Sequence, residues 1–162
     1  MPTFPSNYLL RHQRLELAIE KEESFETTQG LAEIFRRTSM HKASQETFWV
    51  ATYGSRLNVA AVFEVNRGDY LGVNLHIPSL LAGVLVSGSD RFAVAHNHTN
   101  NNGRPSRTDI ELTGMIEQAA QACQLYFEEH LILTPNGRFV SMKALGYLST
   151  EQTIYDAAAA NG

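Results

Sequence analysis

Cysteine is almost absent from this sequence. Cys123 is the only cysteine among 162 residues, so no disulfide can form within the chain. A lone cysteine is typical of proteins kept in a reducing compartment. The sequence also has no run of 18 apolar residues that could cross a bilayer as a helix, and no basic stretch followed by an apolar one at its start. These absences predict a cytoplasmic protein with no signal peptide and no membrane partner.

An excess of positive charge is absent as well. Lys and Arg number 13 against 17 Asp and Glu, which gives a formal net charge of −4. Proteins that coat nucleic acid are usually strongly basic, so this balance argues against non-specific DNA binding. Hydrophobic residues make up 43% and charged residues 19% of the chain, within the range of a globular domain. We therefore expect a single domain with its own core.

Hydrophobic patterning predicts strands with interleaved helices. Helices are expected at 28–37, at 78–88 and from residue 106 onward, and strands at 47–53, 58–65, 91–97, 126–134 and 139–141. The dipeptides at 54–55 and 136–137 have the composition of hairpin turns. Residues 7–23 fit a strand or a helix equally well. A short strand at 72–76 and the cap of a last helix at 149–152 complete the predicted α/β pattern.

The helix expected after residue 106 carries an apolar stripe. Leu112, Ile116, Ala119 and Cys123 recur at helical steps of 4, 3 and 4 residues. We expect this face of the helix to pack in the core. The thiol of Cys123 is therefore expected to be buried as a small apolar group.

The densest polar cluster is His96-Asn97-His98, with Asp109 further along the chain. Residues two apart on a strand lie on the same face, so both imidazoles are expected to point the same way. Two imidazoles and a nearby carboxylate suit zinc, which takes three protein ligands and a water in catalytic sites. A plainer interpretation stays open, because Ser106 and Asp109 have the spacing of a capping box and capping alone would explain both.

The segment from His96 to Asp109 resembles the JAMM signature, His-x-His-x7-Ser-x2-Asp, of JAB/MPN-domain metallopeptidases. Seven residues lie between His98 and Ser106, and two lie between Ser106 and Asp109, as in that signature. Within this superfamily the chain is most similar to the bacterial RadC-like branch. Four fixed residue types at fixed spacing make the resemblance specific.

The resemblance extends over residues 46–148 and includes Thr113 and the segment 129–132. It implies an α/β (α+β) fold of the JAB/MPN type, a curved β-sheet flanked by helices in a single domain. We accordingly expect an N-terminal extension that packs on the domain (1–45), the RadC-like JAB/MPN domain (46–148), and a C-terminal helix or tail (149–162).

The resemblance further implies a zinc-dependent hydrolase that cleaves a peptide or isopeptide bond. His96, His98 and Asp109 would hold one Zn²⁺ per chain and activate a water molecule. Glu64, within an apolar strand, matches the family's upstream glutamate and would act as general base and then as general acid. Ser106 would donate a hydrogen bond to the oxyanion of the tetrahedral intermediate.

Other residues near the signature are expected to contact the substrate or support the site. Asn97, Arg104 and Arg107 are candidates for substrate contact, and the two arginines would favour an acidic or carboxylate-bearing substrate. His76 matches a family histidine and is expected to be structural or to orient a ligand from behind. The sequence departs from the family after the second histidine, where residues 99–101 read Thr-Asn-Asn in place of Pro-Ser-Gly.

A second class of function is compatible with the same fold. A catalytically silent module could bind DNA or a protein partner in DNA repair or in mobile-element biology, because a fold alone does not settle function. The complete ligand set favours the enzyme. A homodimer suits a domain of this size, although no residue pattern demands one. Zinc-dependent cleavage, as opposed to zinc-independent and salt-sensitive DNA binding, would separate the two classes.

Overall fold

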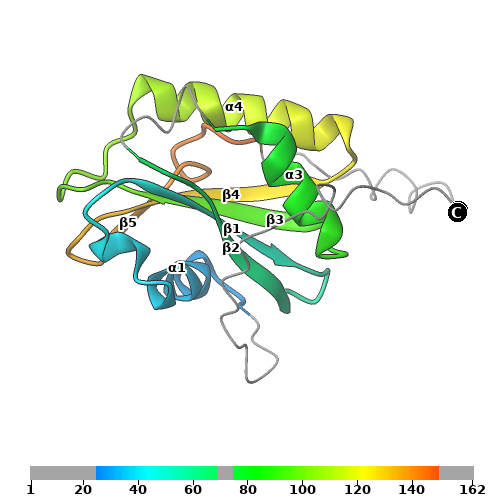
Figure 1. The fold of residues 1–162 in the computed structure, drawn as a ribbon, viewed down its shortest axis with the longest axis horizontal. Helices are drawn as coiled ribbons and strands as arrows, with labels where there is room; N and C mark the ends of the chain where they lie inside the picture. The colour runs from blue at the N-terminus through cyan, green and yellow to red at the C-terminus, as the bar shows by residue number, and fades with distance from the viewer. Residues whose placement is uncertain (1–24, 69–74, 150–162) are drawn as a thin grey trace, which may run out of the picture.

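The computed structural model describes residues 25–68 and 75–149, and Figure 1 shows their arrangement. The helices and strands are α1 (Thr28–Arg37), η2 (Met40–Lys42), β1 (Thr47–Tyr53), β2 (Val59–Arg67), α3 (Ile77–Val86), β3 (Arg91–Asn97), α4 (Arg107–Ala122), β4 (Tyr126–Leu133) and β5 (Phe139–Ser141). The helices and strands predicted over these residues are confirmed, with small shifts at their ends. The predictions at 7–23, 72–76 and 149–152 fall wholly or partly outside the described residues.

The five described strands form one open sheet in the order β2-β1-β3-β4-β5. Neighbouring strands are antiparallel except for β3 and β4, which run parallel. A parallel pair needs a long crossover connection, and α4 supplies it between β3 and β4. The predicted α/β class is therefore confirmed.

Helices cover both faces of the sheet (Figure 1): α1 lies on one face, and α3 and α4 lie on the other. Sheet side chains alternate between two apolar clusters. Trp49 and Ala95 belong to the cluster that includes α1, whereas Phe48 and Val94 belong to the cluster that includes α3 and α4. This alternation decides which sheet residues can face the N-terminus of α4.

Residues 25–45 share this core. Thr27 caps α1 by accepting a hydrogen bond from the backbone N–H of Gly30 at 3.1 Å. Leu31 and Phe35 of α1 are buried in the same cluster as Trp49. The boundary that we expect at residue 46 stays a prediction.

The prediction that Cys123 is buried is wrong, because its side chain is exposed. The helix ends at Ala122, and Gln124 adopts a positive φ of 56° that turns the chain into β4. The buried face of α4 therefore ends at Ala120, before the helical period brings Cys123 back to the sheet.

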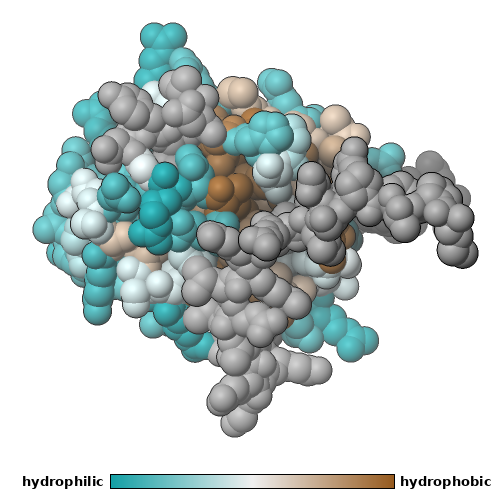
Figure 2. All heavy atoms as spheres, in the orientation of Figure 1, coloured by the Kyte–Doolittle hydropathy of each residue, from teal (hydrophilic) through white to brown (hydrophobic). Residues whose placement is uncertain are grey.

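The visible face of the molecule is mostly polar, with an apolar area near its centre (Figure 2). The largest exposed apolar side chains of the described residues include Leu85 and Val86 of α3 and Met115 of α4. None of the helices in the described ranges combines the length and the apolar character that a membrane crossing requires.

Candidate metal centre

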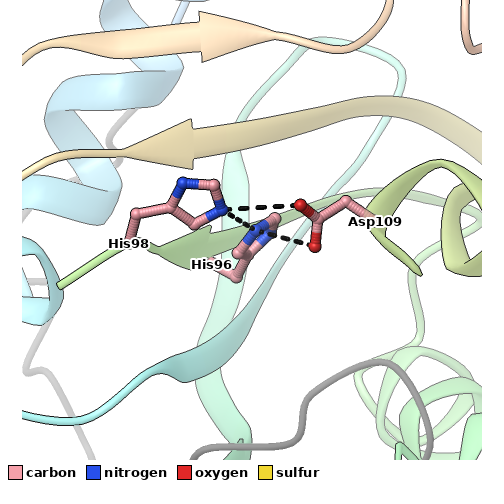
Figure 3. Close-up of side chains that lie close together, drawn as sticks. All are labelled: His96, His98 and Asp109. Atoms are coloured by element: carbon pink, nitrogen blue, oxygen red, sulfur yellow. Dashed lines mark hydrogen bonds and ion pairs between the residues drawn. The ribbon is translucent and has the colours of Figure 1, made fainter. Parts of the chain in front are cut away.

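The two histidines of the predicted ligand set lie at the C-terminal end of β3. His96 is buried and its ring stacks on Phe48, with 6.1 Å between ring centroids. His98 follows the last residue of the strand, and its Nε2 atom lies 3.2 Å from the Nε2 atom of His96. The structure thus confirms that the two imidazoles point to the same place (Figure 3).

Asp109 reaches this place from the first turn of α4. The Ser106 hydroxyl oxygen accepts from the Asp109 backbone N–H at 3.1 Å, and Asp109 Oδ2 accepts from the Ser106 N–H at 2.7 Å. The same carboxylate lies close to both imidazoles, with Oδ1 at 3.2 Å from His96 Nε2 and Oδ2 at 3.4 Å from His98 Nε2. Asp109 is therefore a capping residue and a candidate ligand at once.

The spacing of these ligand atoms fits a tetrahedral metal ion. Zinc ligands at about 2.0–2.1 Å from the metal lie about 3.3–3.4 Å from one another in a tetrahedron. The three contacts between the side chains here measure 3.2, 3.2 and 3.4 Å. His96, His98 and Asp109 could therefore hold a metal ion with little rearrangement.

The donor set is rich in electron pairs. The Asn102 carbonyl lies 2.7 Å from His98 Nδ1, so Nδ1 carries a hydrogen and Nε2 is the atom that faces Asp109. The hydrogen bond with Asp109 raises the pKa of His98, although burial opposes this shift. Burial opposes ionisation of Asp109, but hydrogen bonds from His96 and His98 hold the pKa of Asp109 well below its usual range. The ionised carboxylate and the two imidazoles form a donor set that could hold a cation.

The loop after His98 is fixed by asparagine side chains. Asn100 Oδ1 accepts from the Asn102 N–H at 2.9 Å, and Asn102 Oδ1 accepts from the Arg104 N–H at 3.0 Å. Asn101 Oδ1 accepts from the Asn136 N–H at 3.1 Å, which ties the loop to the turn between β4 and β5. These contacts hold the Asn102 carbonyl that orients the second histidine.

Asn97 lies beneath the site and is fully buried. Its Oδ1 accepts from the Thr47 N–H at 2.7 Å and from the Thr47 hydroxyl at 2.8 Å, and its Nδ2 donates to the Gln45 carbonyl at 3.1 Å. The side chain that we expected to contact substrate is thus engaged with the start of β1. It holds the chain on both sides of Glu46.

Glu46 is the acidic residue that sequence reasoning missed. It directly precedes β1, and β1 pairs with β3 where Phe48 lies opposite His96. The hydrogen bond with Asp109 is the main cause of the raised pKa of His98, and the charge of Glu46 adds to it. The only sequence signal for Glu46 was its place directly before an apolar strand. Many acidic residues without a special function have the same place.

The structure does not bring Glu64 to the three ligands. Phe63 and Val65, on either side of it, pack against the cluster of α3 and α4, so strand alternation points Glu64 to the opposite face. Its carboxylate instead accepts from Arg67, with Nε–Oε1 at 2.8 Å and Nη2–Oε2 at 2.6 Å. This ion pair accounts for an acid within an apolar strand.

The remaining predicted residues lie around the site. His76 is exposed at the N-cap of α3, and its Nδ1 lies 2.7 Å from the Ser79 hydroxyl. Arg104 is exposed in the loop before α4, and Arg107 is exposed in the first turn, where it pairs with Glu111 at 2.7 Å. Their predicted roles toward substrate stay predictions.

Residues 25–147 match the family model of the RadC-like JAB domain. The chain is 28% identical over 99 residues to a UPF0758 protein of Psychrobacter sp. (strain PRwf-1). These 99 residues make up 61% of the chain and 44% of that protein. It is 27% identical over 107 residues to a UPF0758 protein of Desulforudis audaxviator, with 66% and 46% covered. A UPF0758 protein of Xanthomonas oryzae pv. oryzae is 24% identical over 139 residues, with 86% and 61% covered. The chain thus spans about half the length of the first two of these relatives.

Proposed function

The chain belongs to the RadC-like JAB domain family, and from its site we propose a zinc-dependent hydrolase that cleaves a peptide or isopeptide bond. One observation carries the proposal. His96, His98 and Asp109 converge with the spacing of a tetrahedral zinc site. Two imidazoles and one carboxylate leave the fourth position of such a site for water or substrate, as hydrolysis requires. We propose one zinc ion per chain.

Glu46 is the proposed general base. A bound zinc ion supplies a Lewis acid that stabilises negative charge and lowers the pKa of water toward about 7. Glu46 takes the proton of the attacking water and passes it to the leaving nitrogen. Two observations support this role: the charge of Glu46 acts on His98, and the Asn97 amide fixes the backbone on both sides of Glu46. Glu64, which the sequence predicted for the same role, is held by Arg67.

Ser106 is proposed to stabilise the oxyanion. Its hydroxyl oxygen accepts from the Asp109 N–H, and this contact leaves the hydroxyl hydrogen for a substrate oxygen. Arg104 and Arg107 are exposed cations at the same junction of loop and helix. They are proposed to favour substrates with a carboxylate near the cleaved bond.

The test measures the metal content of the purified chain by mass spectrometry, then the cleavage of linear peptides and isopeptide-linked peptides with and without zinc. We expect about one zinc per chain, loss of that zinc in a His96→Ala/His98→Ala variant, and cleavage only with zinc. No zinc after loading would contradict the proposal. Salt-sensitive DNA binding without zinc-dependent cleavage would support the binding module instead. The homodimer and the cytoplasmic location stay predictions.

A further inference from the structure

A chain of buried hydrogen bonds runs behind His96. The Thr113 hydroxyl lies 2.6 Å from the backbone carbonyl oxygen of Asp109 and 2.7 Å from His130 Nδ1. His130 Nε2 then lies 2.8 Å from His96 Nδ1. Thr113, His130 and His96 come from α4, β4 and β3, and each is at most 1% exposed. The signature residues do not include Thr113 or His130.

The hydrogens of this chain can be assigned by counting donors. A carbonyl oxygen only accepts, so the Thr113 hydroxyl donates its single hydrogen to Asp109. Its oxygen can then only accept from His130, which places a hydrogen on His130 Nδ1.

His130 is neutral in this arrangement, because its two nitrogens meet a hydroxyl and an imidazole, with no carboxylate in contact to offset a buried charge. A neutral ring has one N–H, so His130 Nε2 accepts and His96 Nδ1 donates.

We propose that Thr113 and His130 are positioning residues that keep a hydrogen on His96 Nδ1, so that Nε2 is the nitrogen left to bind the metal. This inference rests on the proposed metal centre, because Nε2 is the His96 atom that faces His98 and Asp109. His98 obtains the same tautomer from one backbone carbonyl, that of Asn102. His96 needs the longer relay because its Nδ1 faces the side chain of His130.

The hydrogen-bond relay begins and ends at Asp109, one of the three candidate ligands. Asp109 offers its carboxylate to the imidazoles and its backbone carbonyl to Thr113. The N-terminal turn of α4 therefore sets both the position of the carboxylate and the hydrogen position on His96. Partners that fix a ligand imidazole from behind typically change metal affinity by 10–100-fold when removed.

Thr113→Val tests the relay, because valine keeps the shape of threonine and removes the hydroxyl. His130 Nδ1–H then loses its acceptor, so His130 is expected to carry its hydrogen on Nε2 and donate to His96. His96 must then place its own hydrogen on Nε2, toward the metal position. Thr113→Ser keeps the hydroxyl and should restore the wild-type tautomer. Thr52→Val is the matched control, because Thr52 is also fully buried and its hydroxyl makes no hydrogen bond.

Two readouts decide the result. Nitrogen-15 NMR of histidine-labelled, zinc-free protein, at a pH about 1.5 units above the usual histidine pKa of about 6.5, reports which nitrogen of His96 carries hydrogen. Competition with a chromophoric chelator reports zinc affinity. We expect a hydrogen on His96 Nδ1 in the wild type and in Thr113→Ser, no hydrogen on that atom in Thr113→Val, and a loss of zinc affinity of about 10–100-fold in Thr113→Val alone. Thr52→Val should bind zinc as the wild type does.

Each outcome bears on a distinct statement. An unchanged His96 tautomer in Thr113→Val would overturn the relay, and so would an unchanged zinc affinity. A tautomer switch in a chain that binds no zinc even as wild type would support the relay and contradict the proposed function. Equal losses of affinity in Thr113→Val and Thr52→Val would reduce Thr113 to a general packing role and overturn the inference.

Discussion

The parallel strands β3 and β4 have a polar cluster at each end, and the two clusters differ in how they are completed. At the N-terminal end Arg91 forms an ion pair with Glu128, and its guanidinium carbon lies 4.5 Å from the centre of the Tyr126 ring. At the C-terminal end two imidazoles meet the carboxylate of Asp109. The first cluster contains both signs of charge, so its charges offset each other within the chain. The second brings two imidazoles to one carboxylate, a set that could hold a metal ion.

The largest expected effect comes from comparing Glu46, the proposed general base, with Glu64, which forms an ion pair with Arg67. Glu46→Gln should keep zinc and lower turnover by about 10²–10⁴-fold, because general base catalysis contributes that much. Glu64→Gln removes only an ion pair with Arg67, whose side chain is half exposed, and should leave turnover near the wild-type value. Zinc content and the cleavage rate are measured on both variants. A loss confined to Glu64→Gln would restore Glu64 as the base.

A matched pair of charge removals compares the two ends directly. Asp109→Asn should weaken zinc binding by more than about 100-fold, beyond the usual cost of losing an outer hydrogen-bond partner. Glu128→Gln removes the same charge from the other end of the strand pair and should bind zinc as the wild type does. Chelator competition gives both affinities. Equal losses of zinc affinity would mean that distant charges affect the metal as much as Asp109 does. The two ends of the strand pair would then not differ.

The ion pair of Arg91 and Glu128 should contribute modestly to stability. Arg91 and Glu128 each expose 27% of their side chains, and such pairs contribute about 0.2–1 kcal/mol. Glu128→Gln should therefore lower the free energy of unfolding by no more than about 1 kcal/mol. Urea unfolding without metal measures this loss. A loss several times larger would show that the pair is as critical as the ligand cluster.

The smallest effect concerns Glu129, a buried carboxylate next to His130 in β4. Burial raises its pKa, against the hydrogen bonds that it accepts from Ser141, Lys143 and His130. A raised folded pKa means that the carboxyl's contribution to stability is complete below the ordinary value of 4.5 and is lost as pH rises through the folded pKa.

The stability of the wild type relative to Glu129→Gln should therefore fall as pH rises from about 4.5. Urea unfolding of both proteins at several pH values measures the difference. A difference that stays constant with pH would show that the buried carboxyl does not titrate differently in the folded state.

Sequence patterns predicted the fold where apolar runs end at strong turn signals. The residues 47–53 and 91–97 match the observed bounds of β1 and β3. The end of α4 was misjudged because the apolar period continues to Cys123, while the stop depends on a positive φ at Gln124. Glycine usually marks such a conformation, so a glutamine there gives no warning.

The ligand set was predictable because all three residues lie in one short stretch of chain with fixed spacing. Glu46 and His130 were not, because only the pairing of β1 and β4 with β3 brings their parts of the chain near the ligands. Strand alternation predicts which face of the sheet a residue takes, but it does not predict which strands are neighbours. Glu64 was predicted from its match to the family's upstream glutamate, and that match carried no information on which face of the sheet it takes.

The crossover through α4 has a kinetic consequence. His96 and Asp109 lie within the unit β3-α4-β4, and the relay of Thr113 and His130 is complete only when the two parallel strands pair. Parallel pairing waits for the crossover to close, which is slow because its contacts are distant along the chain. The ion-binding geometry is therefore absent from early folding species. Added zinc should leave the refolding rate unchanged and slow the unfolding rate, because the ligands come together only after the transition state for folding.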